Sequence, residues 1–259
     1  MPKSAGYVSP EYLRKSAELA GKLKQESYRQ MRIKADSHVL DLGCGPGLDT
    51  IPLARLVGKA GRVVGIDIDE AMLLQADDYA EQEGVSEQVK HQQADILSLP
   101  FADNSFDAVR AERLFQVLPE SYVMQDVFKE IYRVVKPGGY IVLVDADWAT
   151  ASVDYPDDEL ERRLMTFFAS SMRPNGFAGR QFYRLLIDNT MQDISVLAYP
   201  LVLNDYSLTP FQQWLVDEAC KNNIATQDEM HNWLSTLSAD DEQNRFYSTV
   251  NMNIVSGRK

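Results

Sequence analysis

Residues 39–47 read Val-Leu-Asp-Leu-Gly-Cys-Gly-Pro-Gly, an apolar run that leads directly into a glycine-rich turn. The apolar run predicts a buried strand of a parallel sheet. Glycine has no Cβ atom, so the turn can adopt unusual backbone dihedrals and let a ligand touch the main chain. Roughly residues 49–57 predict a helix whose free N–H groups and positive dipole end point toward that ligand. We therefore expect a nucleotide-like molecule to bind at this turn.

The spacing of the glycines distinguishes two classes of nucleotide site. The dinucleotide fingerprint is G-x-G-x-x-G, but counting from Gly43 the sixth position is Leu48. The pattern present is Asp-x-Gly-x-Gly-x-Gly, which starts at Asp41 and resembles motif I of the class I S-adenosylmethionine-dependent methyltransferases. The resemblance implies that Asp41 lies near the methionine moiety of the cofactor and that the glycines pack against it.

A second acid follows the next predicted strand. Residues 62–67 read Arg-Val-Val-Gly-Ile-Asp, a buried strand that ends in a carboxylate 20 positions after Gly47. Such a carboxylate can accept two hydrogen bonds from a ribose diol, and the family uses this position in that way. Asp69 is expected to cap the helix that follows. The alternative for Asp67 is that it and Asp69 only cap this helix.

Three later stretches also resemble the family. Residues 94–101 contain an acid at Asp95 that the family places at the adenine amino group, with Ile96 against the ring. Residues 105–109 have the family's "FD-x-V" form, and residues 136–144 resemble its "K-P-G-G" turn into strand five. With these ordered matches over roughly residues 37–147, the chain is identified as similar to the small-molecule methyltransferases of the type 11, quinone-biosynthesis-like group.

The resemblance implies a fold and a set of cofactor residues. The expected fold is α/β: a Rossmann-like seven-stranded sheet in the order 3-2-1-4-5-7-6, with strand 7 antiparallel, helices on both faces and a helical cap. Parallel strands place their carboxyl ends, and the ligand, at one edge of the sheet. The expected S-adenosyl-L-methionine site consists of Asp41, Gly43, Cys44, Gly45, Gly47, Asp67, Ile68, Met72, Asp95, Ile96, Glu112 and Arg113.

The chain is expected to form a single methyltransferase domain over residues 1–259. Residues 1–34 predict an N-terminal helical lid, residues 35–148 the cofactor-binding half, and residues 149–259 a substrate cap with the C-terminal strands. Further expected elements are one or two helices over 10–33, helices over 119–135, 157–172 and 179–189, a helix after a capping box at Thr226, and strands over 194–203 and 245–255.

Composition limits the partners. A net charge of −12 argues against a nucleic-acid substrate. No apolar run approaches the roughly 20 residues of a membrane span, and no apolar signal core is seen. Only Cys44 and Cys220 are present, so we expect no disulfides and a cytoplasmic location. No acid is paired with His or Cys at metal-ligand spacing, so no metal is expected. A homodimer is left open.

Catalysis is harder to assign from sequence. At the end of the predicted strand five, Asp147 could orient or deprotonate an acceptor, and Trp148 could line an apolar or cationic pocket. The alternative is a loop acid and a packed indole. Where quinone-biosynthesis relatives often carry a histidine, this chain has Gln116-Val-Leu-Pro119, so no histidine base is inferred. The expected substrate pocket consists of Phe115, Gln116, Trp148, Arg180, Tyr7 and Tyr12.

The expected activity is transfer of a methyl group to a small, partly apolar acceptor through an O, N or C atom, in that order of preference. In-line displacement needs positioning rather than a covalent intermediate. Two alternatives remain: a non-catalytic S-adenosylmethionine-binding subunit, and a nicotinamide-dependent oxidoreductase. The second is disfavoured by Leu48, which stands where a third glycine belongs, and by the Pro-Gly pair at residues 46–47.

Overall fold

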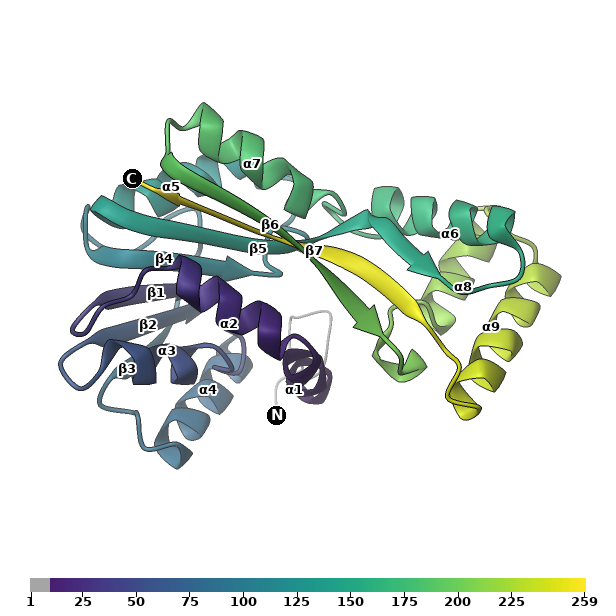
Figure 1. Ribbon diagram of the computed structural model, residues 1–259, viewed down its shortest axis with the longest axis horizontal. Coiled ribbons are helices and arrows are strands. Elements are labelled where there is room, and N and C mark those ends of the chain that lie inside the picture. Colours follow the sequence, from purple (N-terminus) through teal and green to yellow (C-terminus); the bar gives the residue numbers. More distant parts are fainter. Residues whose placement is uncertain (1–9) are drawn as a thin grey trace.

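The computed structural model describes residues 10–259, with side chains from Leu13 onward, as a seven-stranded sheet with helices on both faces (Figure 1). The strands are β1 (His38–Leu42), β2 (Arg62–Asp67), β3 (Val89–Gln93), β4 (Phe106–Glu112), β5 (Val135–Val153), β6 (Gln192–Leu203) and β7 (Ser248–Arg258). They lie in the order β3-β2-β1-β4-β5-β7-β6, and β7 runs antiparallel to both neighbours. The predicted strand order and the direction of strand 7 are confirmed.

Helices alternate with most of the strands of the described chain, as predicted. They are α1 (Pro10–Leu19), α2 (Gly21–Gln30), α3 (Thr50–Val57), α4 (Glu70–Gln82), α5 (Met124–Val134), α6 (Asp158–Ser171), α7 (Ala178–Asp188), α8 (Gln213–Lys221), α9 (Gln227–Glu242) and a 3-10 turn, η1 (Tyr206–Leu208). None of them is both long enough and apolar enough to cross a lipid bilayer.

Alternation along β1 explains why both faces of the sheet are covered. Val39 belongs to the hydrophobic core on the side of α2 and α3, whereas Leu40 and Leu42 belong to the core on the side of α5 and α7. All three side chains are fully buried, as expected for a central parallel strand. The strand that enters the glycine turn is therefore held from both sides.

Two predicted caps are confirmed and one helix start is wrong. Asp69 caps α4 by accepting the N–H groups of Ala71 and Met72, and Thr226 forms a capping box with Glu229 at α9. The helix expected from residue 119 begins only at Met124. Residues 119–122 instead close a turn, and Val123 is extended, so the helix cannot start earlier.

The strand expected to end near residue 147 continues to Val153. The outer part of β5 pairs with β7 through Ser152 and Val153, so these strands project beyond the rest of the sheet. Figure 1 shows this projecting ribbon, together with α6, α8 and α9, as a separate mass at the carboxyl ends of the parallel strands. We call residues 148–173 and 201–250 the cap lobe.

Candidate functional site

A cavity of about 510 Å³ lies where the parallel strands end and the cap lobe begins. One part, the strand-end half, is lined by the turns after β1 to β4. The other part, the cap half, is lined by Ala146, Trp148, Arg173, Leu201, Leu203, Leu208, Val250 and Met252. The predicted site at the carboxyl edge of the sheet therefore coincides with one continuous cavity.

The glycine turn presents bare backbone to the strand-end half. All three glycines have left-handed φ angles: +68° at Gly43, +51° at Gly45 and +79° at Gly47. A Cβ atom on Gly45 would meet only Leu13 within 4 Å, at 3.9 Å, so this part of the turn faces open space. A Cβ on Gly47 would lie 3.0 Å from that of Ala76. Gly47 therefore packs the turn against α4 and does not line the cavity.

Asp67 is fixed at the end of β2 beside this turn. Its Oδ2 accepts the N–H of Gly45 at 2.9 Å, and its Oδ1 accepts the N–H of Asp69 at 3.0 Å. Each carboxylate oxygen has a second lone pair, so the group can still accept hydrogen bonds from a diol. The arrangement fits the ribose of a nucleoside.

Apolar side chains line the cavity next to Asp67, in a part of it that we call the slot. Met72 and Ile96 line it and are almost fully buried, whereas Ile68 is 65% exposed at its edge. The Asp95 carboxylate accepts the N–H of Leu97 at 2.9 Å and the hydroxyl hydrogen of Tyr122 at 3.1 Å. Tyr122 was not predicted, because nothing in the local sequence separates it from an ordinary turn tyrosine. The slot combines apolar walls with a hydrogen-bond acceptor, as an adenine requires.

A buried network of charges closes the cavity on the side of α2. Lys24 lies 2.6 Å from Asp49 and 2.9 Å from Glu112. Arg110 contacts Glu112 closely and lies 3.2 Å from Asp49. Although burial alone would raise it, Arg110 and Lys24 hold the pKa of Asp49 well below its usual range. We call Lys24, Asp41, Asp49, Arg110 and Glu112 the charge network.

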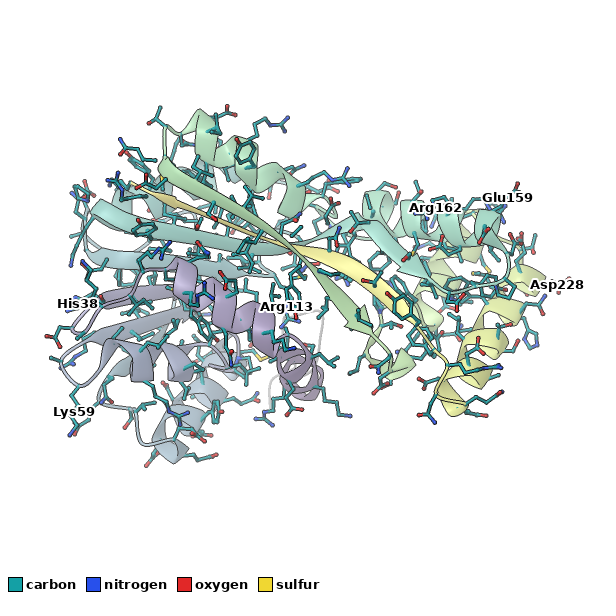
Figure 2. All side chains as sticks on the ribbon, viewed as in Figure 1. His38, Lys59, Arg113, Glu159, Arg162 and Asp228 are labelled. Atoms are coloured by element: carbon teal, nitrogen blue, oxygen red, sulfur yellow. The ribbon has the colours of Figure 1, made fainter. Side chains whose placement is uncertain are left out.

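Two predicted cofactor residues of β4 and its turn lie in the cavity wall. Glu112 and Arg113 line the strand-end half, and their side chains are 3.5 Å apart. Arg113 also donates to the Ser16 hydroxyl of α1 at 2.9 Å. Figure 2 shows Arg113 at the centre of the molecule, near the N-terminal helices. These side chains therefore join the N-terminal helices to the strand ends.

Asp41, a predicted cofactor residue, belongs to the charge network. It is 2% exposed, lies 3.4 Å from Arg110, and is absent from the cavity wall. Burial raises the pKa of this carboxyl to about 7. Asp41 therefore supports the glycine turn from beneath, as part of the charge network. Burial likewise raises the pKa of the Cys44 thiol, which lines the cavity as a neutral group.

Trp148 and Gln116 form the border between the two halves. The indole N–H donates to the Gln116 side-chain oxygen at 2.6 Å, and both residues line the cavity. The backbone N–H of Gln116 is in turn held by the buried carboxylate of Asp145 at 3.1 Å. This chain of contacts fixes the orientation of the indole.

Besides Asp41 and Gly47, three further predicted residues lie outside the cavity. Because β5 does not end at residue 147, its pleat places Ala146 and Trp148 in the cavity wall and turns Asp147 away. Asp147 instead accepts from Arg180 at 2.6 Å, which also removes Arg180 from the pocket. Phe115 packs edge-on against Phe182, with ring centroids 5.2 Å apart. In this structure Asp147, Arg180 and Phe115 therefore do not line the cavity to which the sequence assigned them.

The N-terminal segment contributes to the wall through residues that were not predicted. Leu13 and Ser16 of α1 and Lys24 of α2 line the cavity. Tyr7 lies outside the described residues, and the side chain of Tyr12 does as well. The sequence does not indicate that Lys24 lies in the cavity wall, because its partners are 25 and 88 positions away in the chain.

Comparison with known proteins shows that part of this chain is similar to methyltransferases. Residues 39–139 match the family model described as "Methyltransferase domain". The demethylmenaquinone methyltransferase of Lactobacillus johnsonii is 34% identical over 152 residues, which cover 59% of this chain and 61% of that protein. The matched segments span 41%, 61% and 32% of three curated relatives, so the chain corresponds to only part of their length.

Solved structures show the same fold over almost the whole chain. The YcgJ protein of Bacillus subtilis has a TM-score of 0.60 at 19% identity and covers 93% of this chain and 98% of its own. Geranyl diphosphate C-methyltransferase of Streptomyces coelicolor A3(2), bound to Mg²⁺, geranyl diphosphate and S-adenosyl-L-homocysteine, has a TM-score of 0.58 at 15% identity. That alignment covers 100% of this chain and 88% of the other, so the similarity includes the cap lobe.

Proposed function

We propose that this chain, whose residues 39–139 belong to the class I S-adenosylmethionine-dependent methyltransferase family, transfers a methyl group from S-adenosylmethionine to a small, partly apolar acceptor. The observation that carries the proposal is the continuity of the cavity. A half that fits a nucleoside opens directly into a half lined mainly by apolar side chains. Apolar walls with a few convergent polar groups are typical of small-molecule sites.

The strand-end half supplies the groups that would hold the cofactor. Asp67 would accept the ribose hydroxyls, and Asp95 would accept the adenine amino group beside Ile96 and Met72. Ile68 would cover the outer edge of the ring. The bare backbone at Gly43 and Gly45, with Glu112 and Arg113, would meet the charged amino-acid end. Asp41 and Gly47 act indirectly, because they shape the turn from outside the cavity.

When bound, the cofactor supplies a methyl group on a positively charged sulfur, which an acceptor can displace in line. The contribution of the protein is mainly positional, and holding two reactants in a productive geometry can be worth on the order of 7–11 kcal/mol. Trp148, fixed by Gln116, stands at the border where an acceptor would meet the cofactor. The apolar residues of the cap half exclude water from the acceptor body. The acceptor atom is O, N or C.

The N-terminal helices are proposed to act as the lid of this site. Leu13, Ser16 and Lys24 cover the cavity from one side, and Lys24 is anchored to both α3 and β4 through Asp49 and Glu112. The lid would shield the cofactor from solvent. Movement of the lid, where it occurs, must break buried ion pairs.

A methyl-transfer assay tests the proposal. The purified chain is incubated with methyl-labelled S-adenosylmethionine and a panel of quinols, sterols, aryl acids and amines, and label in the acceptor is counted. We expect transfer to at least one class and its loss in Asp67→Ala. Stabilisation by NAD(H) but not by S-adenosylhomocysteine would overturn the proposal. If the cofactor bound but no acceptor was methylated, the chain would be a cofactor-binding subunit.

A further inference from the structure

Gln116 lies on the border between the two halves of the cavity, and only 5% of its surface is exposed. Its backbone is held from both sides. The N–H donates to the Asp145 carboxylate at 3.1 Å, and the carbonyl oxygen accepts the N–H of Asn175 at 3.3 Å. The side chain therefore extends into the cavity wall from a backbone that the surrounding elements fix.

The indole of Trp148 determines which way the Gln116 amide faces. The indole nitrogen lies 2.6 Å from the side-chain oxygen of Gln116, and an indole N–H can only donate. The amide oxygen must therefore face Trp148, and the NH2 group faces away from it. Trp148 is itself held, because its backbone N–H donates to the Gly176 carbonyl at 2.8 Å and its ring packs edge-on against Phe168. The direction of the NH2 group is thus set by the protein.

The NH2 group of Gln116 has no acceptor among the described residues. Within this part of the chain the side chain has one hydrogen-bond partner, the Trp148 indole, which its oxygen accepts. Gln125 differs, because it both donates to Asn189 at 2.6 Å and accepts from it at 3.2 Å. A buried donor without an acceptor is costly. Since Gln116 lines the cavity, a molecule bound there can supply the acceptor.

The surroundings of this donor favour an uncharged oxygen. The cap half next to Gln116 presents the apolar side chains of Leu201, Leu203, Leu208, Val250 and Met252. Arg173, which also lines this half, packs over the Trp148 ring and is engaged within the molecule. A neutral amide would not compensate the desolvation of an anion against such walls, whereas it can fully pair a carbonyl or hydroxyl oxygen.

We propose that the Gln116 amide donates a hydrogen bond to a carbonyl or hydroxyl oxygen of an otherwise apolar methyl acceptor. This inference rests on the proposed function, because it names the acceptor class of the same site. The hydrogen bond places the oxygen at the border of the two halves and leaves the apolar body along the cap half. Because Trp148 fixes the donor beforehand, the ligand loses little binding energy in ordering it.

Binding measurements test this assignment without an activity assay. The probes 1-tetralone and 2-naphthol, each with one oxygen, are compared with the hydrocarbons tetralin and naphthalene in protein saturated with S-adenosylhomocysteine. Gln116→Glu keeps an oxygen for the Trp148 indole and nearly the same volume, but it replaces the NH2 donor with a carboxylate oxygen. A fifth probe, 1-aminotetralin, carries an ammonium where 1-tetralone carries its carbonyl.

Gln181→Glu is the matched control. The side-chain oxygen of Gln181 also accepts a hydrogen bond, from the Asn175 amide at 2.8 Å, but Gln181 does not line the cavity. The same chemical change is thus made nearby without altering the proposed donor.

We expect Gln116→Glu to weaken binding of at least one oxygen-bearing probe about 10-fold, and binding of the hydrocarbons by less than about twofold. The amine should bind Gln116→Glu more tightly than wild type, because a carboxylate pairs with an ammonium. A purely structural role of Gln116 would not reverse the preference in this way. Gln181→Glu should match wild type for every probe, and binding of S-adenosylhomocysteine should be unchanged in both variants.

The inference is overturned if wild type binds neither oxygen-bearing probe, if Gln116→Glu binds both as tightly as wild type does, or if the amine gains nothing. Weaker binding of S-adenosylhomocysteine to Gln116→Glu would assign the amide to the cofactor and would also overturn it. Failure of the wild-type protein to bind S-adenosylhomocysteine would instead remove the proposed function, and this inference with it. The two failures are therefore distinguishable.

Discussion

The ammonium of Lys24 lies 2.6 Å from the carboxylate of Asp49, and only 8% of the lysine side chain is exposed. Through this contact α2 is tied to the residue that immediately precedes α3, next to the glycine turn. Lys24 and Asp49 also line the cavity. The N-terminal helices are therefore part of the site wall in this structure and not an independent appendage.

Replacing Lys24 with Met should destabilise the protein by about 3–5 kcal/mol, because it leaves the buried Asp49 and Glu112 without one of their cations. Chemical denaturation measures this change. The matched control is Arg29→Ala on the same helix, whose partner is Glu26 and whose side chain is 77% exposed. That surface pair should contribute no more than about 1 kcal/mol. Equal losses of stability in the two variants would contradict the stabilising role of the buried Lys24–Asp49 ion pair.

Replacing Asp67 with Ala should weaken binding of S-adenosylhomocysteine by about 10- to 100-fold, the loss of charged hydrogen bonds. Titration calorimetry measures the dissociation constant. Asp78→Ala serves as the control, because Asp78 is an exposed acid of α4 that does not line the cavity. An unchanged dissociation constant in Asp67→Ala would remove this residue from the site.

Replacing Gly47 with Ala should cost about 2–4 kcal/mol, the sum of left-handed backbone strain and overpacking against Ala76. Gly84→Ala separates the two causes. Gly84 also has a positive φ, +68°, but a Cβ there would meet nothing within 4 Å. This control should cost only about 1 kcal/mol by denaturation. If both variants lost the same stability, the contact with α4 would not matter.

The buried carboxyl of Asp145 should make stability depend on pH. Burial raises its pKa to about 7, above the usual 3.8, so the folded state binds an extra proton between these values. Raising the pH then favours unfolding, by at most about 1.4 kcal/mol per pH unit up to pH 7. The stability advantage of wild type over Asp145→Asn should be largest below about pH 4, should fall between pH 4 and pH 7, and should be lost by pH 8. A stability difference between wild type and Asp145→Asn that grows with pH would contradict this direction.

The predictions that were confirmed came from local patterns. The strand and glycine turn at residues 39–47 and the caps at Asp69 and Thr226 each depend on residues that are adjacent in the chain. The strand order followed from the family resemblance, which covers a continuous segment. Local spacing is sufficient for such features, because neighbouring residues set the dihedrals and the first hydrogen bonds.

The charge network and the cap half could not be predicted in this way. Lys24 and Glu112 are 88 positions apart, and only the folded sheet brings them together. Asp147 does not line the cavity because β5 continues past it in pairing with β7, and this pairing is not visible from residue 147 itself. The guanidinium of Arg173 packs against aromatic rings from three separate elements. In each case the deciding contacts are distant in the sequence.

A crystal structure of this chain with S-adenosylhomocysteine tests the central claim most directly. We expect the ribose hydroxyls within hydrogen-bonding distance of the Asp67 carboxylate, the adenine between Ile68, Met72 and Ile96, and the sulfur atom facing Trp148 and the cap half. A nucleoside bound away from Asp67, or a sulfur atom with no open path to the cap half, would contradict it.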